Sequence, residues 1–110
     1  MNKHIYVYIA SPYSQGDIGQ NLKTHMDYAS KLIDNGFIPF VPLLYHFLHI
    51  HHPKTYNDWF EQDLRWLDKC DCLLRLPGES IGADLEVEFA KETGIDVFYD
   101  IEEMYAYYSD

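Results

Sequence analysis

The sequence predicts an α/β fold built on a parallel β-sheet. Short segments rich in β-branched and aromatic residues alternate with longer segments whose apolar residues follow helical i, i+3, i+4 spacing. The chain is 47% hydrophobic and 16% aromatic, which suits a globular protein. Because strands that alternate with helices form right-handed crossovers, we expect helices on both faces of the sheet.

Four segments are expected to form strands, at 4–10, 37–41, 72–76 and 95–99. The first, His-Ile-Tyr-Val-Tyr-Ile-Ala, has the continuous β-branched and aromatic character of a strand buried on both faces. Pro39 has no backbone N–H to donate, so the second strand is expected at an edge of the sheet.

Four further segments are expected to form helices, at 20–34, 56–69, 83–93 and 101–108, whereas 42–55 shows no regular pattern. The first helix is expected to bury one apolar face, formed by Leu22, Met26, Ala29, Leu32 and Ile33. The expected architecture is a flavodoxin-like or Rossmann-like three-layer sandwich with a four- to five-stranded parallel sheet. With 110 residues, the chain is expected to form a single domain that spans residues 1–110.

Charge and hydropathy exclude several classes of partner. The formal net charge of −10 argues against a nucleic-acid polymer, because such binding depends on Lys and Arg side chains that neutralise phosphates. A small phosphorylated ligand needs only a few local donors and stays possible. No apolar run approaches the roughly 18 residues of a membrane-spanning helix, and no secretion signal is evident.

The two cysteines give no sign of redox chemistry or of a metal site. Cys70 and Cys72 are separated by one residue, which is not the spacing of a thioredoxin-type motif and supplies too few ligands for zinc. We therefore expect two reduced structural thiols in a cytoplasmic protein.

Two carboxylates are expected at positions where a buried negative charge would cost free energy. Asp63 falls on the apolar stripe of its helix, among Tyr56, Trp59, Phe60, Leu64 and Leu67. Glu86 is expected in the first turn of the next helix, where the helix dipole favours the ionised form. That turn follows a strand, at the edge of a parallel sheet where ligands bind. Two acids brought together from different elements can break a glycosidic bond. The alternatives are that Glu86 only stabilises its helix and that Asp63 only bonds to loop backbone.

Three loops, 10–17, 42–55 and 77–82, are expected to surround this pocket. Ser80 is a natural helix N-cap, and an N-cap can also contact a ligand. The imidazoles of the second loop belong to His46, His49, His51 and His52. They lack Asp, Glu or Cys partners at ligand spacing, so we expect neither a metal nor a cofactor. A substrate contact by His46 or His49 is the better interpretation, while Trp59 and Trp66 are expected in the core or at an interface.

Three motifs carry a family resemblance that spans nearly the whole chain. They are Tyr8-Ile-Ala-Ser-Pro-Tyr-Ser, Asp63-Leu-x-Trp-Leu-x-x-Cys-Asp71 and Ser80-x-Gly-x-x-x-Glu86-x-x-x-Ala90. Together they resemble the nucleoside 2-deoxyribosyltransferase superfamily. The pattern is closest to its 2′-deoxynucleoside 5′-monophosphate N-hydrolase branch and to uncharacterised small bacterial and phage relatives.

The resemblance implies a role for each matched residue. Glu86 matches the nucleophile that attacks C1′ of the sugar and forms a covalent glycosyl–enzyme ester. Asp63 matches the acid that contacts the sugar or assists proton movement to the leaving base, and Tyr8, in preference to Tyr6, matches the residue that positions the nucleophile. Ser80 matches a position that contacts the 5′-phosphate in the nucleotide-cleaving branch and is Asp in transferases of free nucleosides. The implied substrate-binding set is completed by Ser11, Pro12, Tyr13, Ser14, Gln15, Gly16, His46 and Gly82.

The chain also departs from the family pattern. Residues 11–17 contain no Arg to hold a phosphate, and Asp17 would repel an anion. Asp84 and Glu88 replace glycines that are common around the catalytic Glu. The function expected from the resemblance is hydrolysis of the N-glycosidic bond of a (2′-deoxy)nucleoside 5′-monophosphate, in a homodimer or larger homo-oligomer. The alternatives are a 2-deoxyribosyltransferase of free nucleosides, a non-catalytic nucleotide-binding or sensing module, and a metal-dependent hydrolase.

Overall fold

A computed structural model describes residues 4–12 and 17–109, apart from the side chain of His46. Its sheet contains β1 (Tyr6–Ala10), β2 (Ile38–Phe40), β3 (Cys72–Arg75) and β4 (Asp96–Phe98). These strands lie in the order β2-β1-β3-β4, and every neighbouring pair is parallel. The expected four-stranded parallel sheet is confirmed, with the Pro39 strand at its edge.

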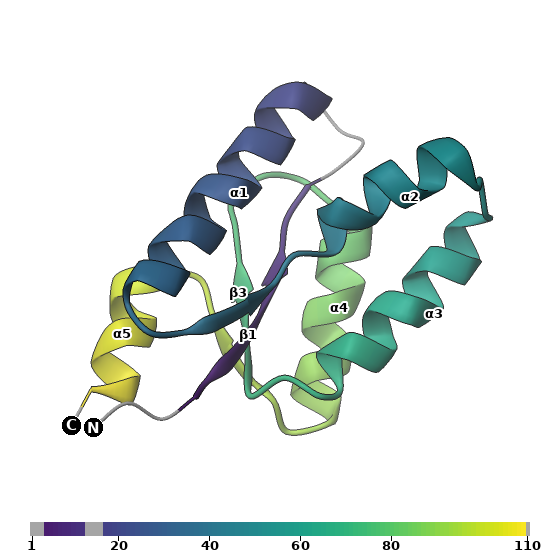
Figure 1. Cartoon of the computed structure of the whole chain (residues 1–110). Helices are drawn as coiled ribbons and strands as arrows, with labels where there is room; N and C mark the ends of the chain where they lie inside the picture. The colour runs from purple at the N-terminus through teal and green to yellow at the C-terminus, as the bar shows by residue number, and fades with distance from the viewer. Residues whose placement is uncertain (1–3, 13–16, 110) are drawn as a thin grey trace.

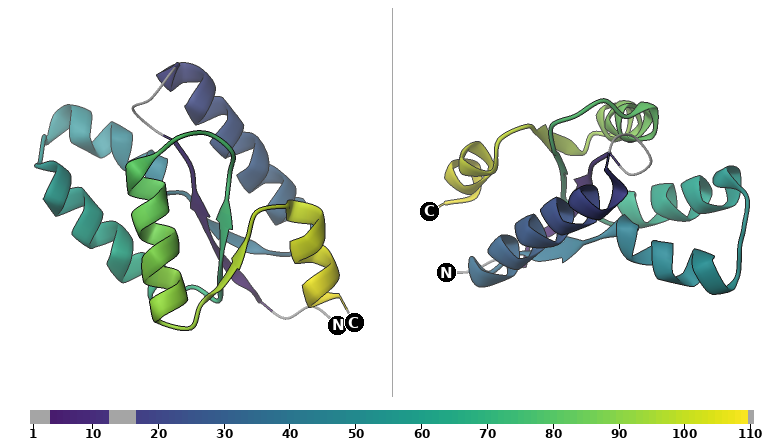
Figure 2. Two further views of the ribbon diagram at one scale, coloured as in Figure 1. Left: turned by 180° about the vertical axis from the view of Figure 1, so that it is seen from behind. Right: turned by 90° about the horizontal axis from the view of Figure 1, so that it is seen from above.

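Helices cover both faces of the sheet. They are α1 (Ile18–Asp34), α2 (Tyr45–His51), α3 (Tyr56–Leu67), α4 (Ile81–Glu92) and α5 (Ile101–Tyr108). Helices α1 and α5 lie on one side of the strands, and α3 and α4 lie on the other (Figures 1 and 2). This is the three-layer, flavodoxin-like arrangement that the alternating pattern predicts.

Strand β1 separates two hydrophobic cores because successive side chains point to opposite faces. Val7 and Ile9 pack into the core beneath α1 and α5. Tyr8 and Ala10 pack into the core beneath α3 and α4. All four side chains are buried, so the strand shows no alternation of polar and apolar residues. This register places the Tyr8 ring on the face that carries α4.

The segment expected to be irregular is partly helical. A short 3₁₀ helix at Pro42–Leu44 continues into α2, and α2 and α3 lie side by side as a projecting pair (Figures 1 and 2). Pro42 begins the 3₁₀ turn, and the next proline, Pro53, follows the end of α2. Because α2 has seven residues, it is too short to show a clear helical period.

The buried face of α1 differs from the expected one. His25, Ala29 and Leu32 are its buried residues, whereas Met26 and Ile33 are 46% and 62% exposed. The stripe at i, i+4 and i+7 is narrow because α1 packs near the edge strand β2. His25 is therefore buried, whereas the sequence pattern predicts that its apolar neighbour Met26 is buried.

Side-chain caps fix the beginnings of the long helices. Asp17 accepts a hydrogen bond from the Gln20 amide at 3.1 Å and begins α1. Thr55 and Asp58 form a capping box on α3, and Ser80 Oγ accepts from the Ala83 amide at 3.1 Å to begin α4. Within the described residues, no helix is both long and apolar enough to cross a membrane.

Candidate active site

A cavity of about 720 Å³ opens at the carboxyl edge of the sheet. It lies where the end of β1 meets the beginning of α4 and the α2–α3 pair, as expected for a parallel sheet. Its described lining residues are Ile9, Ser11, His25, Pro42, Leu43, Tyr45, His49, Lys54, Tyr56, Trp59, Phe60, Asp63, Ser80, Ile81, Gly82, Ala83, Leu85 and Glu86. The cavity thus combines an apolar, aromatic wall with two carboxylates.

Glu86 is a buried carboxylate held by a tyrosine. Its side chain is 7% exposed, and the hydroxyl of the fully buried Tyr8 donates a hydrogen bond to Glu86 Oε2. Burial raises the pKa of Glu86 to about 8, while the Tyr8 hydrogen bond acts in the opposite direction. Of the two strand tyrosines considered, Tyr8 makes this contact, whereas Tyr6 is 48% exposed.

The expected effect of the helix dipole on Glu86 is small. Helix α4 begins at Ile81, so Glu86 lies in its second turn and not in the first. The influence of the dipole falls off within the first turn, whereas the cost of burying a charge acts at any position. The pKa of Glu86 is accordingly raised, not lowered.

Asp63 reaches the same cavity from α3. Its Oδ1 atom is buried and has no hydrogen-bond partner among the described residues. Burial raises the pKa of Asp63 to about 7, and the charge of Asp63 contributes to the raised pKa of Glu86. Two acids that repel each other in an enclosed space hold a proton more strongly than either would alone in water. The structure thus brings together the two carboxylates that the sequence places on different helices.

Tyr56 is a site residue that the sequence assigned only to the apolar stripe of α3. A Cβ atom placed on Gly82 would lie 3.1 Å from the Tyr56 hydroxyl, so this hydroxyl sits over the beginning of α4. Burial raises the pKa of Tyr56, and the charges of Glu86 and Asp63 raise it further. The i, i+3, i+4 pattern could not reveal this role, because a tyrosine on such a stripe usually only packs.

An aromatic wall faces the carboxylates. Tyr45 stacks on Trp59 with ring centroids 5.4 Å apart, and Tyr56 stacks on Phe60 at 5.8 Å. Trp59 was expected in the core or at an interface, but it lines the cavity. Its Nε1 donates to His49 Nδ1 at 2.7 Å. Because an indole N–H can only donate, the proton of a neutral His49 ring lies on Nε2.

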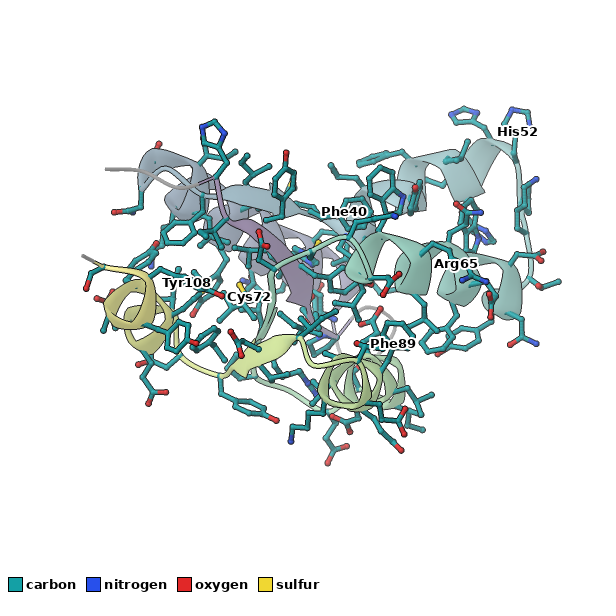
Figure 3. All side chains as sticks on the ribbon, turned by 90° about the horizontal axis from the view of Figure 1, so that it is seen from below. Phe40, His52, Arg65, Cys72, Phe89 and Tyr108 are labelled. Carbon is teal, nitrogen blue, oxygen red and sulfur yellow. The ribbon has the colours of Figure 1, made fainter. Side chains whose placement is uncertain are left out.

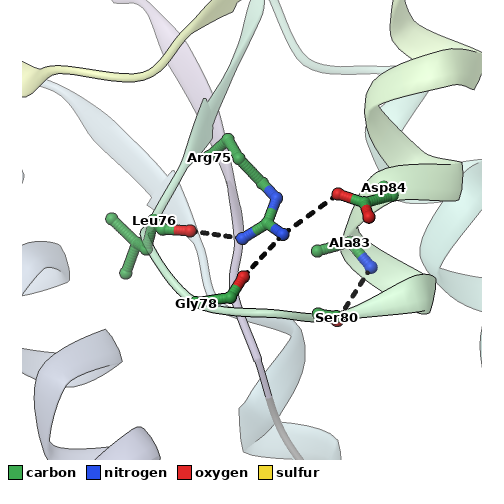
Figure 4. Close-up of polar contacts among 6 residues, drawn as sticks. All are labelled: Arg75, Leu76, Gly78, Ser80, Ala83 and Asp84. Atoms are coloured by element: carbon green, nitrogen blue, oxygen red, sulfur yellow. Dashed lines mark hydrogen bonds and ion pairs between the residues drawn. The ribbon is translucent and has the colours of Figure 1, made fainter.

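Arg75 organises the turn between β3 and α4 (Figure 4). Its guanidinium donates to the Leu76 carbonyl, to the Gly78 carbonyl at 2.9 Å and to Asp84 Oδ1 at 3.0 Å. Its positive charge also acts to lower the pKa of Glu86. Asp84 is thus the partner of a buried cation.

The predicted substrate-binding residues fall into three groups. Ser11, Ser80 and Gly82 line the cavity. Pro12 is buried beside Gly78 and is not among the described lining residues. The other predictions, Tyr13, Ser14, Gln15, Gly16 and the side chain of His46, lie outside the described residues.

The described histidine side chains of α2 belong to His49 and His51. Among the described residues, no group of three His, Cys, Asp or Glu side chains could hold a metal ion. His52 lies at the outer end of the α2–α3 pair, remote from Cys72 in the sheet (Figure 3). Cys70 and Cys72 are free, and burial raises the pKa of each thiol to about 12.

Fold and site together define a flavodoxin-like α/β protein with a buried, tyrosine-bound carboxylate in an aromatic pocket. The chain belongs to the family described as Domain of unknown function (DUF7768), whose model matches residues 5–100. No curated protein matches it. One similar solved structure is a 2-deoxyribosyltransferase from Bacillus psychrosaccharolyticus, with 20% identity and a TM-score of 0.62. The match covers 84% of this chain and 69% of that one, and this likeness shows a shared fold.

Proposed function

We propose that the protein cleaves the N-glycosidic bond of a (2′-deoxy)nucleoside 5′-monophosphate and releases the free base. The observation that carries this proposal is the hydrogen bond from Tyr8 to Glu86 in a cavity that also contains Asp63. A buried carboxylate that is oriented by a hydroxyl and accompanied by a second acid is suited to glycosidic chemistry. The shared fold with a 2-deoxyribosyltransferase and the motifs around Tyr8, Asp63 and Glu86 support the same superfamily.

The proposed reaction has two displacements. One oxygen of the Glu86 carboxylate attacks C1′ and forms an ester, while the C1′–N bond breaks and its electron pair leaves with the base. The departing nitrogen takes a proton from Asp63 or from a water that Asp63 orients. Water then gives a proton to the deprotonated Asp63 and attacks C1′, the ester bond breaks, and Glu86 regains its charge as the sugar phosphate leaves.

The electrostatics of the two acids suit a division of roles. Tyr8 donates to Glu86, which stabilises the ionised nucleophile, whereas Asp63 Oδ1 has no donor among the described residues. Burial raises the pKa of both groups, so the pair retains a proton near neutral pH. Because the pKa of Glu86 is the higher of the two, this proton first lies on Glu86. It must pass to Asp63, directly or through water, before Glu86 can attack and Asp63 can act as the general acid.

Recognition of the 5′-phosphate is proposed at the beginning of α4 and at the cavity mouth. Ser80 Oγ accepts from the Ala83 amide, which leaves its own O–H free to donate. Lys54 is the only Lys or Arg among the described lining residues and is exposed. The phosphate must lie about one sugar away from Glu86, because a nearer dianion would raise the pKa of the nucleophile further.

The test is a panel of 2′-deoxynucleosides and their 5′-monophosphates, with free base measured by chromatography. We expect base release from monophosphates, loss of release in Glu86→Gln, and unchanged release in Glu88→Gln. Glu88 is an exposed residue of the same helix, so its substitution is a matched control for the lost charge. Binding without release would indicate a sensing module, and release only with an added acceptor base would indicate a transferase. Loss of activity with a chelator would indicate a metal-dependent hydrolase.

We also propose a homodimer or larger homo-oligomer. Tyr99 and Tyr107 are 60% and 62% exposed, and Tyr107 packs edge-on against Tyr108 at the surface of α5. Large exposed aromatic side chains are more common at subunit contacts than on free surfaces. Light scattering on the purified chain tests this proposal, and a monomeric mass at high micromolar concentration would contradict it.

A further inference from the structure

A serine–histidine pair lies in the cavity but has no part in the reaction proposed above. His25 comes from α1 and is 1% exposed, and its Nδ1 atom lies 2.7 Å from Ser11 Oγ. The other ring nitrogen, Nε2, is buried and has no hydrogen-bond partner among the described residues. Both residues line the cavity that contains Glu86.

An unpartnered nitrogen in this position needs an explanation. Leaving a buried polar atom without a partner costs roughly 1–3 kcal/mol, and most such atoms in folded proteins are paired. The cavity lining also includes Ile9, Pro42 and Leu43, none of which has a side-chain polar atom that could pair with this nitrogen. A group from a bound ligand would supply the missing partner.

The surroundings identify the part of the ligand that this nitrogen contacts. Ile9 is on the face of the sheet beneath α1, whereas Tyr8 and the carboxylates lie toward α3 and α4. The cavity is lined by residues from both sides, so it extends over the end of β1. The end toward α1 includes the apolar side chain of Ile9, whereas the end toward α4 includes Ser80 and the polar N-terminus of that helix. A flat base fits the first end, and a sugar phosphate fits the second.

The charge of His25 agrees with a neutral ligand group. Burial lowers the pKa of His25 to about 4, so the ring is uncharged at neutral pH. An uncharged imidazole offers one donor and one acceptor and does not neutralise a phosphate.

We propose that His25 hydrogen-bonds an edge atom of the base through Nε2 and that Ser11 orients its imidazole through Nδ1. This inference rests on the proposed function and adds the residue that recognises the leaving base. The serine hydroxyl can donate to Nδ1 or accept from it, so Nε2 can present either an N–H or a lone pair. The His25–Ser11 pair therefore selects a base by where its polar edge atom lies, and less by whether that atom donates or accepts a hydrogen bond.

The test uses two substitutions that each retain one half of the imidazole. The amide of His25→Asn can reach Ser11 but has no atom at the place of Nε2, whereas the amide of His25→Gln reaches the place of Nε2. Each is made in the Glu86→Gln background, so that ligands are bound but not consumed. Calorimetry then measures the binding of the four natural deoxynucleosides and their 5′-monophosphates. The 3-deaza- and 7-deazapurine analogues and a 2-pyrimidinone deoxynucleoside are measured in the same way.

We expect His25→Asn to weaken binding of the preferred ligand by about 5- to 50-fold, which corresponds to one lost buried hydrogen bond. His25→Gln should retain most of the affinity. For the one analogue that lacks the contacted base atom, His25→Asn should bind as tightly as its parent. The substitution in the protein and the missing atom of the analogue remove the same hydrogen bond, so their effects do not add. Equal losses for every analogue, equal affinity of His25→Asn and its parent, or no binding by any probe would overturn the proposal.

A second measurement does not depend on substituting His25. In the Glu86→Gln chain, the ¹⁵N resonance of His25 Nε2 should shift when the preferred deoxynucleoside is added, and an unchanged resonance would contradict the contact. The two proposals can fail separately. Base release that needs Glu86, without any effect of His25→Asn, would remove only the base contact. A His25-dependent affinity without base release would remove only the catalytic function.

Discussion

Replacing Glu86 with Gln should make the protein more stable at neutral and alkaline pH, although it should abolish activity. The Glu86 side chain is buried beside a second acid, so its ionised form is costly in the folded state. Gln has nearly the same shape, carries no charge and can still accept the hydrogen bond from Tyr8. The substitution therefore removes the charge while leaving the packing unchanged.

The magnitude follows from the pKa of this carboxyl. Burial raises the pKa of Glu86 from 4.5 to about 8, so the folded state binds more protons than the unfolded state between these two values. Stability must fall as pH rises through that range, at up to about 1.4 kcal/mol per pH unit. Between pH 5 and pH 7.5 the wild-type chain should lose up to about 3 kcal/mol through Glu86 alone. Asp63, whose pKa is raised to about 7, adds a further loss of the same sign.

Urea denaturation at several pH values between 5 and 8.5 measures this effect. The free energy of unfolding of Glu86→Gln should fall less steeply with pH than that of the wild type, and the variant should be the more stable of the two above pH 7. The exposed Glu88→Gln control should follow the wild-type curve. Parallel curves for the wild type and Glu86→Gln would refute the claim that Glu86 is a buried, costly charge.

Two further predictions concern the residues around Glu86. Tyr8→Phe removes the hydrogen bond that acts to lower the pKa of Glu86, so the rising limb of kcat/KM against pH should move to higher pH. The value of kcat should also fall by about 10- to 100-fold. An unchanged pH profile would contradict the positioning role of Tyr8. Gly78→Ala should destabilise the fold by roughly 1–3 kcal/mol in urea, because Gly78 has φ +115° and a Cβ there would lie 2.7 Å from Pro12 Cγ. Gly94→Ala is its control, with φ +79° and nothing within 4 Å, and an equal loss in both variants would show that the Pro12 contact contributes nothing.

The order of the elements was predictable from the sequence because the strands are short and apolar and each is separated from the next by a helical segment. Pro39 correctly indicated an edge strand. The sequence pattern does not predict helix α2, because its seven residues show no clear helical period. This segment is also rich in histidine, which has no strong helix preference. The buried face of α1 was assigned to Met26 because apolar character alone decided the choice, whereas the fold buries its neighbour His25.

The candidate site was predictable only where one residue type made a position unusual. An acid on an apolar stripe drew attention to Asp63, and an acid after a strand and turn drew attention to Glu86. Tyr56 and His25 gave no comparable signal, because buried tyrosines and histidines occur in ordinary cores. Their place in the cavity depends on how α1 and α3 lie against the end of the sheet, and this is a property of the tertiary structure.

Mass spectrometry of the trapped chain tests the role of Glu86 most directly. The protein is mixed with a 2′-fluoro-2′-deoxynucleoside 5′-monophosphate, in which the fluorine slows breakdown of a glycosyl ester, and is then quenched in acid and digested. The peptide containing Glu86 should gain the mass of the sugar phosphate, whereas the same peptide of Glu86→Gln should gain nothing. Base release with no adduct on that peptide, or undiminished base release by Glu86→Gln, would contradict it.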